Sequence, residues 1–366
     1  MENFLLTCVV GLCCGLLFLK FKIPGGMMVG SIVGVSTLTI VFHASYMPYA
    51  AKLAAQITAG AFIGCSVEKS DFVRMKSIYK PALVLLSMML CVNVCLGLII
   101  YWIGPMDLLT SLLCAVPGGT SEMPLIAVDM GADAPKVLVL QFFRMAAGVG
   151  IFPSIIAWRA RRLEKRLAPA VIDGVSEPDA AGTESRLQDL PPEKAPPIPF
   201  RWNFFLLTAL IAALSGLGGY VLKMPAGALL CAMFGIIAAK LSGIPVSMPK
   251  QVRRGAQVLA GAYIGSSVSY QDLAELNHLI VPALILILGY FANSWFTGRL
   301  LSRRFHLNIK EGMLVATPAG ASDMALISAD IGVQSTDVIV LQVIRMLTAV
   351  SVFPQIMRAI AMLAGE

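Results

Sequence analysis

The chain contains one sequence pattern twice, at a constant offset of 201 residues. The stretch from Gln56 to Gly64 recurs as Gln257 to Gly265 (257 − 56 = 201), and Phe152-Pro153 recurs as Phe353-Pro354 (353 − 152 = 201). No net insertion or deletion separates these matched positions. The sequence therefore predicts two halves with the same fold, and a structural hypothesis for one half also applies to the other.

Composition places both halves in a membrane. The chain is 57% hydrophobic and 13% charged, with a mean hydropathy of +0.80, whereas soluble domains average about 25% charged residues. Apolar runs of about 20 residues, long enough to cross a bilayer, recur along the sequence. Because a segment in lipid must satisfy its own backbone hydrogen bonds, we expect these runs to be helices.

Each half has six apolar segments. In the first half they cover residues 3–20, 24–43, 49–67, 80–103, 107–129 and 135–158. In the second half they cover residues 203–222, 225–241, 251–269, 279–300, 311–330 and 336–360. The predicted fold class is an all-α polytopic membrane protein made of two homologous repeats.

Three parts of the chain are expected. Residues 1–160 form the first membrane repeat, residues 161–200 a flexible cytoplasmic linker, and residues 201–366 the second repeat. The linker begins basic, turns acidic and Pro-rich, and has too few apolar residues to bury a core. Residues 3–20 are expected to be a retained span, because Met1-Glu2-Asn3 lacks the basic charge of a signal peptide.

The distribution of Lys and Arg favours a specific topology, because cytoplasmic loops are enriched in these residues. If the fifth segment of each half enters and leaves on one side, the basic residues Lys20, Arg74 and Lys80 fall on the cytoplasmic side. Each half then has five spanning helices plus one broken, re-entrant hairpin. Five is an odd number, so the second half is inverted relative to the first. Parallel halves are the alternative.

The fifth segment of each half is interrupted by a motif that membrane helices normally exclude. The two copies run from Pro117 to Met123 and from Pro318 to Met324. Proline removes a backbone donor, and glycine permits unusual backbone angles. The hairpin breaks are therefore expected at Pro117, Gly118, Gly119, Pro318 and Gly320.

A serine and a carboxylate follow each break. Ser121 and Ser322 are expected to cap a new half-helix. Glu122 and Asp323 then lie in its first turn, where the helix dipole favours a negative charge. Backbone groups freed by the break would face a cavity, the arrangement by which discontinuous helices bind ions and anionic groups. A simple kink with a capped carboxylate is the alternative.

The sixth segment of each half carries an arginine deep inside an apolar run. Gln141 and Arg144 share one helix face at i, i+3 spacing, as do Gln342 and Arg345. A charge at this depth is costly unless it is paired or hydrated. We therefore expect each arginine to have a carboxylate partner.

The expected pairs are Arg144–Glu122 and Arg345–Asp323, with Asp129 and Asp330 as alternative partners. Such pairs either pin the hairpins or contact a substrate or ion, and both roles stay open. Gln56 and Gln257, at the start of the Gly-rich third segment, are further candidate site residues. The small residues beside them favour close helix packing.

The motifs together resemble the membrane AbrB-like duplication family of bacteria. They are the paired PGG/PAG-x-S-[ED]-M breaks, the Q-x-x-R helices and the Q-x-x-A-G stretches, and the resemblance covers both repeats. Members carry names such as ammonia monooxygenase or AbrB regulator. The resemblance implies a role in regulating gene expression but no settled substrate or mechanism. The second copy departs from the first at Ala319 and Asp323, so the two hairpins need not be equivalent.

The function expected from the residues is a secondary transporter of a small polar or anionic solute in the bacterial inner membrane. The paired broken helices would form the site, with H⁺ or Na⁺ as coupling ion at Glu122 and Asp323. The chain carries no ATP-binding motif, so an ion gradient is the expected energy source. The alternative is a membrane-bound regulator or sensor that affects gene expression indirectly.

Other classes of function are not expected. Three dispersed histidines and cysteines inside apolar runs offer no metal-binding set, so we expect no metal, no cofactor and no enzyme activity. The net charge of +7 comes from Lys and Arg at helix ends, which argues against a nucleic-acid partner. The expected partners are the lipid bilayer and a small solute or ion, and a homo-oligomer is left open.

Overall fold

The computed structural model describes residues 2–21, 25–75, 78–150, 202–270, 275–305, 308–317 and 336–365, and the elements in these ranges are helices. The first repeat contains α1 (Glu2–Lys20), α2 (Gly26–Phe42), α3 (Tyr49–Ser66), α4 (Lys69–Met75), α5 (Tyr79–Ile103), α6 (Leu108–Ala115), α7 (Glu122–Met130) and α8 (Ala134–Gly150). The second contains α10 (Trp202–Val221), α11 (Gly227–Leu241), α12 (Lys250–Gly265), the 3₁₀ helix η3 (Glu275–Leu279), α14 (Ile280–Phe305), α15 (Ile309–Ala316), α17 (Thr336–Ser351) and α18 (Phe353–Ala364).

Some predictions fall outside the described residues. These are the linker at 161–200 and most of the second hairpin, including Pro318, Gly320, Ser322, Asp323 and Asp330. The described helices otherwise follow the predicted apolar segments closely. The predicted segment 107–129 is broken as expected, because α6 ends at Ala115 and α7 begins at Glu122.

Two features of the helices differ from the prediction. A short helix, α4, lies between α3 and α5, where no apolar run indicated one. The single segment predicted over 336–360 is divided into α17 and α18 at Val352. Pro354 lies in the first turn of α18, where a residue without an N–H donor is well tolerated, so it favours a new helix start there.

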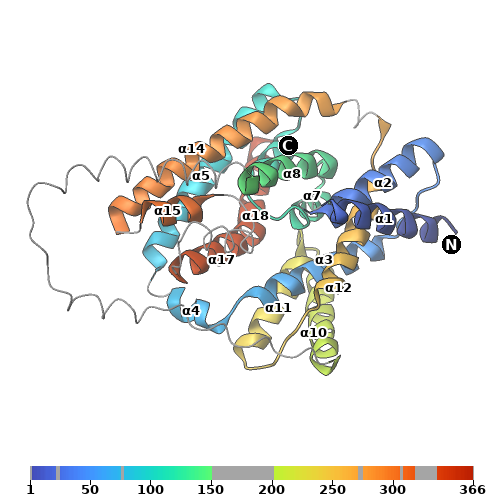
Figure 1. The fold of residues 1–366 in the computed structure, drawn as a ribbon, viewed down its shortest axis with the longest axis horizontal. Coiled ribbons are helices and arrows are strands. Elements are labelled where there is room, and N and C mark those ends of the chain that lie inside the picture. Colours follow the sequence, from blue (N-terminus) through green and yellow to red (C-terminus); the bar gives the residue numbers. More distant parts are fainter. Residues whose placement is uncertain are drawn as a thin grey trace, which may run out of the picture.

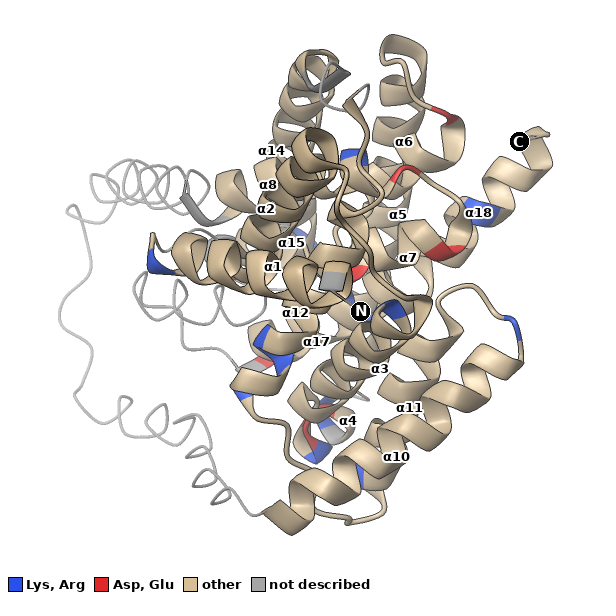
Figure 2. Ribbon diagram, turned by 90° about the vertical axis from the view of Figure 1, so that its right-hand side faces the viewer, with Lys and Arg blue, Asp and Glu red and all other residues tan. Residues whose placement is uncertain are grey.

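Within the described residues, five helical stretches are long and apolar enough to cross a membrane. They are Asn3–Lys20, Tyr79–Ile103, Trp202–Val221, Asn277–Phe305 and Asp337–Ala364. The helices α2 and α11 are apolar but shorter. Large apolar side chains on the long helices point outward, and Figure 2 shows that charged residues are sparse along them. These features support a chain that associates with a lipid bilayer through several helices.

The helices form two bundles, each built by both repeats (Figure 1). The exchange bundle consists of α1, α2 and α3 with α10, α11 and α12. The hairpin bundle consists of α5 to α8 with α14, α15, α17 and α18. In the exchange bundle, α2 packs against α12 and α3 packs against α11, so the repeats share their neighbours. The half-helix α7 contacts α3 and therefore lies where the two bundles meet.

Two glycines at equivalent positions allow this exchange. A Cβ at Gly60 in α3 would lie 2.2 Å from the carbonyl oxygen of Leu229 in α11. A Cβ at Gly261 in α12 would lie 2.6 Å from that of Met28 in α2. Gly261 follows Gly60 by 201 residues (261 − 60), and Leu229 follows Met28 by 201 residues (229 − 28). The two interfaces are therefore equivalent, and close backbone approach requires glycine in both.

Replacing Gly60 with alanine is expected to destabilise the protein, because the new Cβ would meet a backbone oxygen held within another helix. Overpacking of this kind costs about 1–3 kcal/mol or more. Gly255→Ala in α12 is the matched control, since a Cβ there has no neighbour within 4 Å and alanine favours the helix. Thermal unfolding in detergent should give a lower midpoint for Gly60→Ala alone. Equal midpoints for the two variants would contradict the close packing.

Candidate functional site

The break between α6 and α7 leaves backbone carbonyls without helical partners. The helix α6 begins after Asp107, whose carboxylate accepts a hydrogen bond from the Thr110 N–H at 2.8 Å. It ends at Ala115, and Pro117 cannot continue it. Cys114 and Ala115 are fully buried, so water does not reach this end of the helix. The freed carbonyls therefore need donors from the protein.

Side chains of α8 supply such donors. Gln141 Nε2 donates to the Val116 carbonyl at 2.8 Å. Arg144 Nη2 donates to the Gly118 carbonyl at 2.5 Å. The carbonyls at this end of α6 were expected to face a cavity and bind ions. They are instead hydrogen-bonded within the protein, so Gln141 and Arg144 support the hairpin.

The second repeat contributes donors of the same kind. The Tyr290 hydroxyl on α14 donates to the Ala115 carbonyl of the first repeat. Arg345 Nη1 on α17 donates to the Val315 carbonyl at 2.9 Å, at the end of α15. The break in the first repeat is thus partly satisfied by α14 of the second, which ties that helix to the first hairpin.

The carbonyls at the ends of α6 and α15 are not satisfied in the same way. In the first repeat, Gln141 donates to the Val116 carbonyl. In the second, Arg345 donates to the equivalent carbonyl, that of Thr317 (317 − 116 = 201). Gln342 is buried, and its side-chain amide forms no hydrogen bond within the described residues.

The ion pair expected between Arg144 and Glu122 is not formed. No ion pair within the described part of the chain joins these two side chains. The buried carbonyls of the break take guanidinium donors instead, since they have no water. The Glu122 carboxylate folds back over Gly119, where a Cβ would lie 1.7 Å from its Oε2 atom. The predicted Arg345–Asp323 pair lies outside the described residues.

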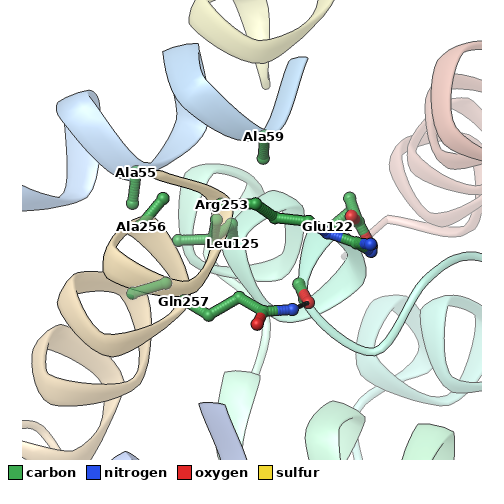
Figure 3. Close-up of a pocket in the computed structure, with 9 residues that line it drawn as sticks. Ala55, Ala59, Glu122, Leu125, Arg253, Ala256 and Gln257 are labelled. Atoms are coloured by element: carbon green, nitrogen blue, oxygen red, sulfur yellow. Dashed lines mark hydrogen bonds between the residues drawn. The ribbon is translucent and has the colours of Figure 1, made fainter. Parts of the chain in front are cut away.

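Glu122 faces the exchange bundle across a small cavity. The cavity has a volume of about 10 Å³, close to the space that one water molecule needs, and Ser121, Arg253 and Gln257 line it. Figure 3 shows the Arg253 side chain extending from α12 toward Glu122. Glu122 is only 6% exposed, and it forms no hydrogen bond or ion pair through its carboxylate within the described residues. A buried carboxylate in this state can bind a cation or a proton.

Ser121 does not have its predicted role. It occupies the N-cap position of α7, but its side chain forms no capping hydrogen bond. Its backbone is already helical there, with φ −90° and ψ −33°, so the hydroxyl is not directed at the free N–H groups. The Ser121 hydroxyl instead accepts a hydrogen bond from Gln257 Nε2 at 2.9 Å. Two predicted site residues from different repeats are therefore in contact.

Asp129, at the other end of α7, is held by α3 and by the start of α11. Its Oδ1 atom lies 2.5 Å from Lys52 Nζ. Its Oδ2 atom accepts hydrogen bonds from Gln56 Nε2 at 2.8 Å and from the Ala226 N–H at 3.1 Å. The helix dipole disfavours a carboxylate at a helix C-terminus, and these three partners offset that cost. Lys52 is 3% exposed, so this ion pair is buried.

Lys52 and Arg253 occupy equivalent positions in the two repeats (253 − 52 = 201). Each precedes a site glutamine by four residues, Gln56 or Gln257, and so shares its helix face. The half-helix α7 therefore lies between two equivalent pairs of side chains, each made of a cation and a glutamine. Lys52 and Gln56 lie near Asp129, and Arg253 and Gln257 lie near Glu122. Gln56 and Gln257 were predicted as site residues, whereas Lys52 and Arg253 were not, although the repeat offset relates them.

An open cleft adjoins Asp129 on the side of α10 and α11. It has a volume of about 370 Å³. Polar and charged side chains from four segments line it: Tyr49, Gln56, Asp129, Tyr220, Lys223 and Arg358. The site thus has two compartments, a water-sized cavity beside Glu122 and a solute-sized cleft beside Asp129.

Comparisons with known proteins agree with this two-part chain. The family described as "Transition state regulatory protein AbrB" matches residues 1–160 and 167–361. A Bacillus subtilis (strain 168) relative, "Uncharacterized protein YhjN", is 25% identical over 318 residues, which cover 85% of this chain and 79% of the relative. An Escherichia coli (strain K12) relative, "Putative regulator AbrB", is 22% identical over 362 residues, 99% of this chain and 97% of the relative. Because the family match covers nearly the whole sequence, the chain belongs to the AbrB family.

Proposed function

We propose that this chain is a secondary transporter of a small polar or anionic solute. The observation that carries the proposal is the placement of two carboxylates at opposite ends of the half-helix α7, between two bundles of apolar helices. Glu122 borders a water-sized cavity, and Asp129 borders an open cleft. Ionisable side chains inside membrane helices are costly, and they typically mark ion or substrate paths.

The proposal assigns separate roles to the candidate residues. Glu122 binds the coupling H⁺ or Na⁺, because its carboxylate is buried and has no hydrogen-bond partner within the described residues. Asp323 has the same role in the second hairpin. Gln141, Arg144 and Arg345 hold the broken helices in shape through the carbonyls that they bind.

The proposed architecture has two inverted repeats in the bacterial plasma membrane, residues 1–160 and 201–366, joined by a cytoplasmic linker. Each repeat has five spanning helices and one re-entrant hairpin. The reciprocal packing of α2 on α12 and of α3 on α11 supports a two-fold relation between the repeats, because equivalent surfaces are exchanged. The distribution of Lys and Arg favours the inverted form of this relation. Repeats of this kind, with broken helices at the site, are common in secondary transporters. No enzyme activity is proposed.

The inversion predicts opposite labelling of two equivalent positions. Lys80 at the start of α5 and Val281 at the start of α14 are both exposed and differ by the repeat offset (281 − 80 = 201). In a cysteine-free background, Lys80→Cys should react with an impermeant thiol reagent only from the cytoplasmic side and Val281→Cys only from the outer side. Labelling of both from the same side would show that the halves are parallel.

Solute counterflow tests transport without an imposed gradient. Proteoliposomes loaded with one unlabelled organic anion at a time, such as acetate, lactate, succinate or glutamate, are diluted into a trace of the same labelled anion. A transporter should show transient accumulation of the label for at least one anion. Protein-free vesicles should show none. Label levels equal to those of protein-free vesicles for every anion and for neutral polar solutes would contradict transport.

The names of the family and of one relative favour a second candidate, a membrane-bound regulator or sensor that affects gene expression indirectly. The family description and the name of the Escherichia coli relative both refer to regulation. A sensor would bind a ligand at the same site without moving it. Ligand binding without counterflow, together with a change in gene expression when the chain is deleted, would favour this candidate over transport.

A further inference from the structure

We propose that the cleft beside Asp129 is the binding site for the solute and that the solute is a small organic oxyanion, carrying a carboxylate or phosphate group. This inference rests on the proposed transport function and names its substrate class and location. The cleft, of about 370 Å³, lies between α3, the end of α7, the turn from α10 to α11, and α18. Its size is within the range of small-molecule sites.

The charges of the cleft walls favour an anion. Among the described residues that line the cleft, Asp129 is the only carboxylate. Its charge is already balanced by Lys52 at 2.5 Å. Lys223 and Arg358 also line the cleft, and neither forms an ion pair within the described residues. Two cations that form no ion pair within the described part of the chain therefore face a space that a solute can enter.

The backbone beside the cleft is held in an unusual conformation. Lys223 has φ 51° and Ala226 has φ 56°, both in the left-handed region that residues with a side chain rarely adopt. Gln355 Nε2 on α18 donates to the Pro225 carbonyl at 3.1 Å, and Asp129 accepts from the Ala226 N–H. The turn from α10 to α11 is thus fixed from two sides, and Lys223 is presented at the cleft.

The cleft already contains one bound carboxylate, that of Asp129 itself. A lysine ammonium, a glutamine amide and a backbone N–H hold this group, which is the donor set that a carboxylate ligand needs. The rings of Tyr49 and Tyr220 lie 5.9 Å apart beside it and add apolar surface for the carbon part of a solute. Asp129 occupies these donors itself, so an oxyanion bound next to it takes its charge partners from Lys223 and Arg358.

This arrangement predicts opposite effects for two kinds of substitution. Removing both free cations, in Lys223→Gln/Arg358→Gln, should weaken anion binding at least tenfold. Asp129→Asn should strengthen it severalfold, because the charge of Lys52 is then no longer balanced and acts on the solute. A gain of affinity in a variant that loses a buried ion pair cannot come from general damage to the fold.

The experiment measures thermal unfolding of the purified full-length chain in detergent. Succinate, phosphate and glycerol phosphate are titrated at constant ionic strength, with neutral succinamide as the uncharged analogue. Arg303→Gln/Arg304→Gln is the matched control, because it removes the same charge from exposed positions at the end of α14. The wild type and this control should show a saturable rise of the midpoint with at least one oxyanion and none with succinamide.

Three results would overturn the proposal. They are the absence of stabilisation by any oxyanion, unchanged affinity in Lys223→Gln/Arg358→Gln, and stabilisation by vesicles containing phosphatidylglycerol but not by glycerol phosphate. The last result would mean that a lipid headgroup occupies the cleft. Binding with the predicted variant effects but without counterflow would overturn transport and leave the oxyanion site. Counterflow without these variant effects would overturn the oxyanion site and leave the transport function.

Discussion

Replacing Lys52 with methionine should lower the free energy of unfolding by about 3–5 kcal/mol, the usual cost of breaking a buried ion pair by removing one partner. Lys52 and Asp129 have side-chain exposures of 4% and 14%, so the pair is largely buried and the lost ammonium leaves the carboxylate without a charge partner. Gln56 and the Ala226 N–H still bind the carboxylate, but they carry no compensating charge. Unfolding in mild detergent titrated with a denaturing detergent measures the change.

The double variant Lys52→Met/Asp129→Leu should lose less stability than the sum of the two single variants, because it leaves no unpaired charge in the bilayer region. An exposed pair provides the control. Arg74 and Asp337 form an ion pair with side-chain exposures of 42% and 37%, and such a pair contributes at most about 1 kcal/mol. Asp337→Asn should therefore have little effect. Additive losses at Lys52 and Asp129 would show that the two side chains are not coupled.

Replacing Glu122 with glutamine is expected to remove the dependence of transport on the ion gradient. The carboxylate borders a cavity that holds about one water, and its position depends on the absence of a side chain at Gly119. Glutamine keeps the size of the side chain but can neither take up a proton at neutral pH nor balance a cation. The gradient-driven rate should fall at least about tenfold, as expected for the loss of roughly 1.4 kcal/mol of ion binding.

Glu311→Gln is the matched control for this substitution. Glu311 also lies in the first turn of a helix of the hairpin bundle, but it accepts a hydrogen bond from the Asn308 N–H and lies away from the cavity. Its rate and its gradient dependence should match those of the wild type. If Glu122→Gln keeps full gradient dependence, Glu122 is not the coupling site.

The sequence was sufficient to predict the long apolar helices and the first break, but not α4 or the division between α17 and α18. Apolar runs of membrane length have few alternatives to helices, and Pro117 cannot lie inside one without interrupting it. The partners of the helices were not predictable in the same way. Periodicity shows which helix face is apolar, but it does not show that α3 of one repeat packs on α11 of the other. That packing follows from close approach at Gly60, which the sequence shows only as a small residue.

The sequence predicted which residues form the site better than it predicted which groups their side chains contact. Gln141 and Arg144 were identified because their polarity conflicts with an apolar run, yet the pairing of Arg144 with Glu122 was wrong. A buried arginine can be satisfied by carbonyls as well as by a carboxylate, and a broken helix supplies carbonyls that have no other donor. Lys52 was not predicted as a site residue, because a lysine in the first turn of a span usually extends to the membrane surface.

The most direct test of the transport proposal is uptake of a labelled small oxyanion into proteoliposomes under an imposed inward H⁺ or Na⁺ gradient. Wild-type protein should accumulate the anion above its external concentration, and an ionophore that collapses the gradient should abolish the accumulation. Uptake that stays at the level of protein-free vesicles, or that is the same with and without either gradient, would contradict gradient-driven transport by this chain.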